Sequence, residues 1–190
     1  MVMYAQESDV ATLNPVELSE RLSVVVRESM PWLVTVSEAE ASVPERPDKW
    51  SAKQVIGHLI DSAVNNLGRI VRLQIGPGQS MPGYEQVAWV NLQHYSKRDW
   101  AQVLALWFAL NEHMAWTVGH IEKAHLGDVG SVAGESLTLG FLIEDYIAHM
   151  RHHLRLMRVW VGIGGDEVES SSRNGWSRCL IHLICFDLQG

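Results

Sequence analysis

Four long stretches of the chain carry apolar residues at helical spacing, and this pattern is the feature that most constrains the fold. Within 52–74, apolar residues return every three or four positions, with no strand-like alternation. Helix-start signals precede the four stretches: Asn14 before Pro15, Ser51 with Gln54, Ser96 with Asp99, and Ser136 or Thr138. We therefore predict helices over about 15–41, 52–74, 96–125 and 138–161, and we expect Pro31 to kink the first of them.

The segments between these helices carry turn-forming residues. Residues 43–49 contain two prolines, and 75–96 and 126–135 are predicted as long loops, with a short extra helix within 84–94. No convincing strand occurs before 179–186. Helices of about 24 residues would each be about 36 Å long and could pair along their full length. The sequence thus predicts an all-α four-helix bundle over residues 1–161 with a long crossover connection, followed by a tail of unassigned structure over 162–190.

Composition excludes several classes of protein. The net charge is −7 and no run of five Lys or Arg occurs, which argues against nucleic acid as a partner. No uninterrupted apolar stretch approaches the roughly 18 residues needed to span a bilayer. Residues 1–14 lack the basic and apolar regions of a secretory signal, and two cysteines do not make a disulfide framework. We expect a cytoplasmic protein with no membrane partner.

The fourth predicted helix carries two histidines at a spacing that suits a metal ion. His149 and His153 are four residues apart, so both imidazoles can reach one point, and their flanking residues form a mostly apolar stripe. Asp145, one turn earlier, could orient the ring of His149. His152 competes as a ligand because it is three residues from His149. A polar helix surface with a chance spacing of histidines remains the alternative.

A third ligand must come from another helix. His58, in the most apolar part of the second predicted helix, is the best candidate, although a lone histidine there is more often a hydrogen-bonded core residue. His113 and His120 on the third helix are the backup ligands, and we interpret them first as surface residues. Cys179, His182 and Cys185 in the tail could also bind a metal, but an apolar tail packed on the bundle or on a partner chain is favoured.

Several segments resemble the DinB-like (DinB/YfiT) superfamily. Residues 48–62, DKWSAKQVIGHLIDS, are similar to the second-helix signature of the family, and the strongest match is TLGFLIEDYIAH at 138–149, continuing to 155. The pairs Asn65-Asn66 and Arg69-Ile70, and the run 82–84 with Trp89, also fit the family pattern. Together these segments span roughly residues 14–160 in the family's order and spacing.

The resemblance implies a bundle in up-down-down-up order, with a divalent metal at one end of its cavity. Carried over by motif, the metal ligands are His58, His149 and His153, the three residues that spacing also favoured. Leu156 stands close to a position where relatives often carry Gln, so one polar neighbour of the site is missing. The chain beyond 162 has no recognised counterpart in the family.

The function that we predict from these residues is divalent-metal chemistry at the three-histidine site. Known relatives include thiol-dependent S-transferases and a metal hydrolase, so the resemblance implies thiol S-transfer first and hydrolysis second, on a small-molecule substrate. The expected cofactor is Zn or Ni, with a low-molecular-weight thiol as co-substrate. Asp61 and Asp145 are the candidate catalytic residues. The alternative is a non-enzymatic metal- or ligand-binding stress-response protein.

We also expect a homodimer. Eight Trp are more than one bundle of this size needs in its core, and relatives often dimerise. The sequence therefore predicts that Trp32, Trp107, Trp116 and Trp160 are not all internal.

Overall fold

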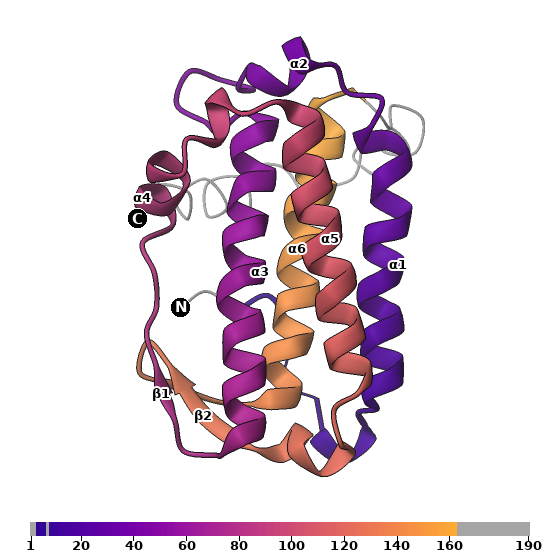
Figure 1. The fold of residues 1–190 in the computed structure, drawn as a ribbon, viewed down its shortest axis with the longest axis vertical. Helices are drawn as coiled ribbons and strands as arrows, with labels where there is room; N and C mark the ends of the chain where they lie inside the picture. The colour runs from indigo at the N-terminus through magenta and orange to yellow at the C-terminus, as the bar shows by residue number, and fades with distance from the viewer. Residues whose placement is uncertain (1–2, 7, 163–190) are drawn as a thin grey trace, which may run out of the picture.

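Four long helices form the body of the protein in the computed structural model, which describes residues 3–6 and 8–162 (Figure 1). They are α1 (Pro15–Leu33), α3 (Ala52–Ile75), α5 (Trp100–Gly119) and α6 (Leu139–Trp160). In Figure 1, α1 and α6 run upward and α3 and α5 run downward. Both α1 and α3 pack against α5 and α6. The predicted all-α bundle and its up-down-down-up order are confirmed.

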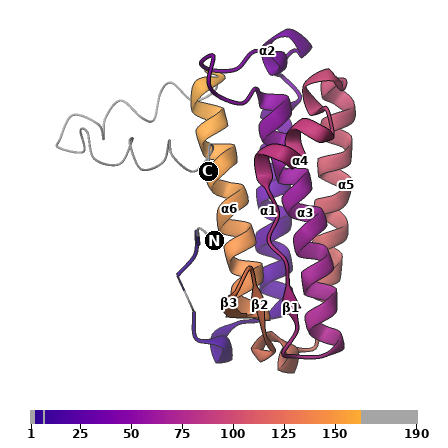
Figure 2. The same ribbon diagram turned by 90° about the vertical axis from the view of Figure 1, so that its left-hand side faces the viewer.

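The crossover connection follows from this order. Because α3 and α5 are parallel, the chain must climb the length of the bundle between them. Residues 76–99 do so along one side, and they contain β1 (Ser80–Met81), α4 (Gln86–Leu92) and the 3-10 turn η2 (Tyr95–Lys97) (Figure 2). The short extra helix expected within 84–94 is therefore present as α4.

A small sheet lies at the lower end of the bundle, and the expectation that the bundle region contains no strand was wrong. β1 pairs in parallel with β2 (Val129–Val132), which pairs in antiparallel fashion with β3 (Glu135–Thr138). Ala133 and Gly134 form the two-residue turn with φ values of 51° and 89°. Strands of two to four residues are too short for alternation to be detected in the sequence.

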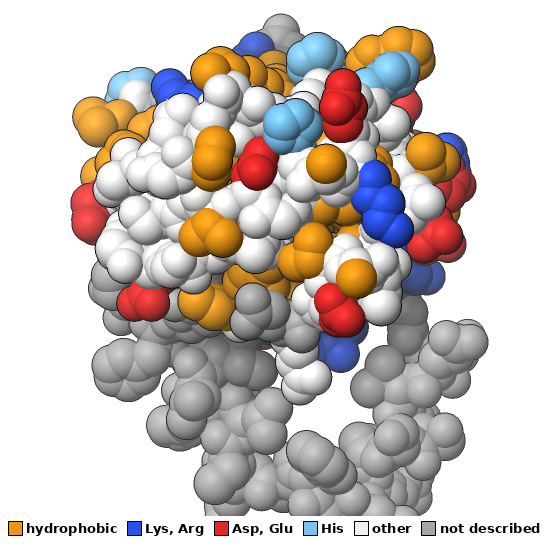
Figure 3. All heavy atoms as spheres, turned by 90° about the horizontal axis from the view of Figure 1, so that it is seen from below, with side chains coloured by type: hydrophobic (Ala, Val, Ile, Leu, Met, Phe, Trp, Pro, Cys, Tyr) orange, Lys and Arg blue, Asp and Glu red, His pale blue; other side chains and the backbone are white. Residues whose placement is uncertain are grey.

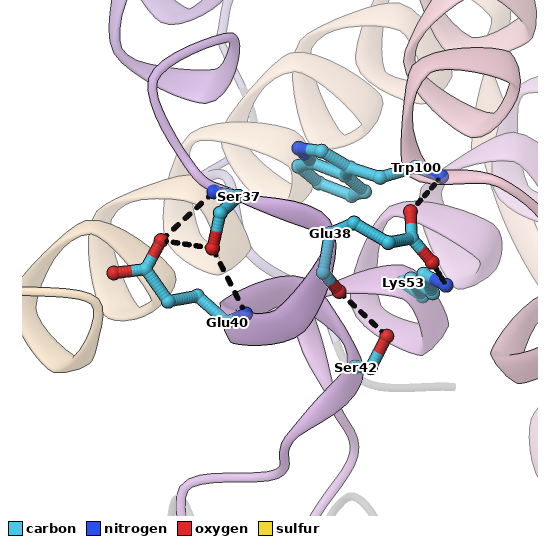
Figure 4. Close-up of polar contacts among 6 residues, drawn as sticks. All are labelled: Ser37, Glu38, Glu40, Ser42, Lys53 and Trp100. Atoms are coloured by element: carbon cyan, nitrogen blue, oxygen red, sulfur yellow. Dashed lines mark hydrogen bonds and ion pairs between the residues drawn. The ribbon is translucent and has the colours of Figure 1, made fainter.

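The first helix also ends earlier than predicted. α1 stops at Leu33, two residues after Pro31, and a separate helix α2 (Glu38–Ser42) follows. The new start has a local cause, because Ser37 and Glu40 form a capping box in which each side chain accepts the other's backbone N–H (Figure 4).

The third helix is likewise shorter than expected, since it begins at Trp100 behind its N-cap Asp99 and ends at Gly119 rather than at 125. The N–H groups of His120 and Ile121 bond to carbonyls three residues back, which closes the last turn. The 3-10 turn η3 (Lys123–Gly127) then leads into β2, as η1 (Val10–Thr12) leads into α1.

Glu38 fixes α2 over the top of the bundle. Its carboxylate contacts the ammonium of Lys53 at the start of α3, and it accepts the backbone N–H of Trp100 at 2.8 Å (Figure 4). The ion pair with Lys53 is the largest cause that lowers the pKa of Glu38. One exposed side chain therefore joins the N-terminal ends of two long helices.

The helices that carry the histidines begin at the predicted cap Ser51 and at Thr138, one of the two predicted alternatives. Ser51 and Gln54 form the capping box of α3, and the Thr138 side chain accepts the N–H of Phe141 at the start of α6.

Of the four tryptophans singled out from the sequence, Trp107 is fully buried and Trp116 is 68% exposed.

No helix in the described part of the chain is long and apolar enough to cross a membrane.

Residues 163–190 lie outside the described part of the chain. The expectations for the tail, including its boundary at 162 and the roles of Cys179, His182 and Cys185, stay predictions.

At the lower end of the bundle, acidic and basic side chains are interspersed with apolar ones among the described residues (Figure 3).

Two glycines on α3 give a matched test of this packing. A Cβ at Gly57 would lie 2.2 Å from the buried ring of Tyr95, whereas a Cβ at Gly68 would meet only the flexible tip of Arg72, at 2.9 Å. We expect Gly57→Ala to lower the free energy of unfolding by about 1–3 kcal/mol through overpacking. Gly68→Ala should leave it unchanged or raise it by up to about 1 kcal/mol through helix propensity. Urea denaturation of both variants checks this, and equal effects would contradict the packing described.

Candidate metal centre

Three histidines from two helices meet between α3 and α6. His58 lies two turns into α3, and His149 and His153 lie on successive turns of α6, which packs against α3. One ring nitrogen from each lies within 4.8 Å of the other two, and the Nε2 atoms of His58 and His149 are 3.0 Å apart. The structure thus brings together the three residues that the sequence singled out.

The three imidazoles are buried, and burial decides their charge. His58 is 1% exposed and His153 is 8% exposed. Burial lowers the pKa of His58 to about 4 and lowers the pKa values of His149 and His153 well below the usual range, with mutual repulsion as a lesser cause. At neutral pH the rings are therefore neutral, which is the form that binds a metal.

The donor set fits a divalent ion. The Nε2 of His153 is buried and has no hydrogen-bond partner among the described residues. The Nε2 atoms of His58 and His149 lie 3.0 Å apart, and no two of the three ring nitrogens are more than 4.8 Å apart. His58, His149 and His153 could therefore hold a divalent ion between them, and imidazole is a common ligand for such ions.

A polar row along α3 orients His149. The Oγ of Ser62 lies 3.4 Å from Nδ1 of His149, and Asn66 donates to that same Oγ at 3.2 Å. Arg69 in turn donates to Asn66 Oδ1 at 3.2 Å. A hydrogen bond at Nδ1 leaves Nε2 facing the other histidines.

Asp145, which was expected to orient His149, has different partners. Its Oδ1 accepts the backbone N–H groups of Tyr4 and Ala5 and so fastens the N-terminal segment to α6. Burial raises the pKa of Asp145, although these two hydrogen bonds oppose the shift. The contact that orients His149 comes from Ser62 instead.

Asp61, the other candidate catalytic residue, faces the crossover connection. Its Oδ1 accepts hydrogen bonds from the hydroxyl of Tyr95 at 2.8 Å and from the side-chain amide of Gln93. Burial raises its pKa to about 6, and these two hydrogen bonds only partly offset that effect. These contacts direct the carboxylate of Asp61 toward α4 and η2.

Aromatic rings cover the cluster on two sides. The ring centroid of Trp50 lies 5.3 Å from that of His58, and the ring of Tyr4 lies 4.9 Å from that of His149. The sequence analysis missed both residues, as well as Ser62 as the partner of His149. Trp50 stands inside the matched family motif, but nothing local in the sequence connects Tyr4 with residues more than 140 positions away.

The competing histidines lie elsewhere. His152 is half-buried beside Tyr4, with ring centroids 5.1 Å apart, and it is not part of the three-residue group. His113 on α5 and His120 directly after it are exposed, as their first interpretation predicted. Within the described residues, the group of side chains that could hold a metal ion is limited to His58, His149 and His153.

A cavity of about 760 Å³ opens beside the cluster and connects it with solvent. Its walls come from α3, α6, the crossover and the β2–β3 hairpin; they include His149, Ser62, Arg69, Tyr84, Tyr4, Asp145, Leu137 and Leu142. Burial raises the pKa of Tyr84 to about 12, so this phenol stays protonated. The site therefore combines neutral imidazoles with a space large enough for a small molecule.

The buried histidines predict how stability depends on pH in the metal-free protein. Their folded-state pKa values lie below the unfolded value of about 6.5, so their contribution to stability is lost as pH falls below 6.5. Asp61 and Asp145 oppose this as the pH falls, because burial raises the pKa of each. We expect the free energy of unfolding to fall by about 2 kcal/mol between pH 7 and pH 5.5, by urea titration of EDTA-treated protein. His153→Gln should show a smaller fall; an identical one would contradict the assignment.

Comparison with known proteins agrees with this architecture. The family model of the DinB superfamily matches residues 21–157. YfiT of Bacillus subtilis, for which a metal-dependent hydrolase activity has been suggested, is 26% identical over 149 residues, which is 75% of each chain. The solved structure of YfiT is described as having an unusual four-helix bundle topology. It matches this chain with a TM-score of 0.73 at 20% sequence identity, and the match covers 83% of this chain and 91% of the YfiT chain. Since the family model spans well over half of the sequence, the chain belongs to the DinB superfamily.

Proposed function

We propose that this protein is a divalent-metal-dependent enzyme whose ligands are His58, His149 and His153. The observation that carries the proposal is that three buried, neutral imidazoles point their nitrogens at one place beside a cavity of about 760 Å³. Burying three histidine side chains without a bound ion costs free energy, because their ring nitrogens lose hydrogen bonds to water. Coordination of a metal ion would give these nitrogens a partner.

A divalent ion held by three imidazoles keeps coordination positions open and lowers the pKa of a water or thiol in one of them. The chain supplies the surroundings. Ser62 contacts the ring of His149, Trp50 and Tyr4 pack against the histidine rings, and the cavity provides space for a substrate. Zn and Ni are the metals that we propose, since imidazole ligands suit both.

Two reactions are compatible with this site, and they differ in what they need from the protein. Hydrolysis is supported by the activity suggested for YfiT, and Asp145 lines the cavity as a candidate proton acceptor. Transfer of a low-molecular-weight thiol is supported by the chemistry of the nucleophile, because a thiol has a pKa near 8.5 and water one near 15.7. A thiol therefore needs less help from a base, and S-transfer is the reaction that we place first.

Self-association and a cytoplasmic location stay predictions. Exposed Trp116 and Phe108 on α5 are the side chains that support a dimer through a helix face.

The metal assignment predicts different outcomes for two neighbouring histidines. His153→Ala should remove bound metal while the helices persist, because the fold depends on apolar packing rather than on the site. His152→Ala, the matched control, should keep its metal. Elemental analysis of untagged protein and circular dichroism test both variants. Equal metal loss would show that the wrong neighbour was chosen, and unfolding of His153→Ala would make the site structural.

Asp145→Asn separates the two reactions. Asparagine keeps an oxygen that can accept the N–H groups of Tyr4 and Ala5, but it cannot take up a proton. We expect hydrolysis of activated esters to fall by about 10²-fold or more if Asp145 is the base. Conjugation of small thiols to electrophiles should change little. Metal-loaded wild-type protein without either activity would favour the non-enzymatic alternative.

A further inference from the structure

Arg69 is a buried cation without a carboxylate partner. It is 7% exposed and lines the cavity from α3. Its Nη1 donates to Asn66 Oδ1 at 3.2 Å and its Nη2 donates to the carbonyl oxygen of Pro82 at 2.9 Å. These contacts use two of the five N–H groups of a guanidinium. No carboxylate of the described residues lies within ion-pair distance of Arg69.

Such an arrangement is unusual for a purely structural arginine. Buried charges are normally paired, because an uncompensated charge loses its hydration without a replacement. Here both partners of Arg69 are neutral oxygens, which fix the guanidinium in place but leave its charge unmatched. The group is therefore held rigidly against a cavity that a ligand can enter.

We propose that Arg69 binds a carboxylate group of the small molecule that reacts at the histidine cluster. The inference rests on the proposed function for the reacting end of that molecule, but the carboxylate subsite itself can be tested without metal. A guanidinium and a carboxylate form two parallel charge-assisted hydrogen bonds, and the remaining N–H groups of Arg69 can supply them.

The charges around the cavity favour a singly charged carboxylate over a phosphate. Arg69 contributes the positive charge, whereas Asp145 and Glu85 contribute carboxylates and Tyr84 is a neutral phenol. One guanidinium neutralises one negative charge. A dianionic phosphate would keep an unmatched charge beside two acidic side chains.

The spacing along α3 indicates the shape of the ligand. Arg69 follows Ser62 by seven residues, or about 10 Å along the helix axis, and Ser62 contacts His149 at the other end of the cavity. Apolar side chains of Leu137, Leu142 and Val132 line the same space. The expected ligand is therefore elongated, with a carboxylate at one end, an apolar middle and the reacting group at the other end.

Isothermal titration calorimetry with a carboxylate and its neutral isostere tests the subsite. The probes are hexanoate, hexanamide and inorganic phosphate, added to the metal-free full-length chain. We expect hexanoate to bind at least about tenfold more tightly than hexanamide, as a charge-assisted hydrogen bond predicts, and more tightly than phosphate. Arg69→Met should remove the preference for hexanoate. Arg72→Met, an exposed arginine one turn further on α3, removes the same charge and should leave the preference intact.

Three results would overturn the proposal: equal binding of hexanoate and hexanamide to the wild type, tighter binding of phosphate, or the same loss in Arg72→Met as in Arg69→Met. If Arg69→Met does not fold, the comparison of the three probes on the wild type still tests the proposal. Arg69→Lys, which keeps the positive charge without the planar guanidinium, should weaken hexanoate binding.

Metal analysis of the wild type is an independent readout. Hexanoate binding without any metal uptake would reject the proposed function and keep the carboxylate subsite.

Discussion

The rest of the site depends on the packing of α3 against α6, which removes three imidazoles from water. Desolvation is the largest cause that keeps His58, His149 and His153 neutral near pH 7, and it leaves a ring nitrogen of His58 and another of His153 without a hydrogen-bond partner among the described residues. Each unpaired buried polar group costs about 1–3 kcal/mol. The apolar packing of the bundle must offset that cost, and coordination of an ion would remove part of it.

The helix order determines where a cavity can form. Because α3 and α5 run in the same direction, the crossover must return along the outside of the bundle, and it passes over the face of α3 that carries Ser62, Asn66 and Arg69. The crossover and the β2–β3 hairpin therefore wall a space that a simple up-and-down bundle would leave open to solvent. The topology thus places a polar row of α3 inside a pocket instead of on the surface.

That polar row links the two ends of the cavity. Arg69 holds Asn66, Asn66 holds Ser62, and Ser62 lies against His149, all within hydrogen-bond distance. The helical repeat produces this series because residues three or four apart lie on one face. One helix therefore both carries His58 and positions His149 of α6.

The sequence by itself determined the four-helix pattern, the caps at Asn14 and Ser51, and the placing of His149 and His153 on one helix face, because these features depend on residues within one or two turns of each other. The apolar surroundings of His58 made it the best candidate for the third ligand, and the family motif around it supported that choice. Only the tertiary structure decided the pairing of β1 with β2, the exclusion of His113 and His120, and the partners of Asp145 and Arg69. These features arise from contacts between residues far apart in the chain, and local periodicity carries no information about such contacts.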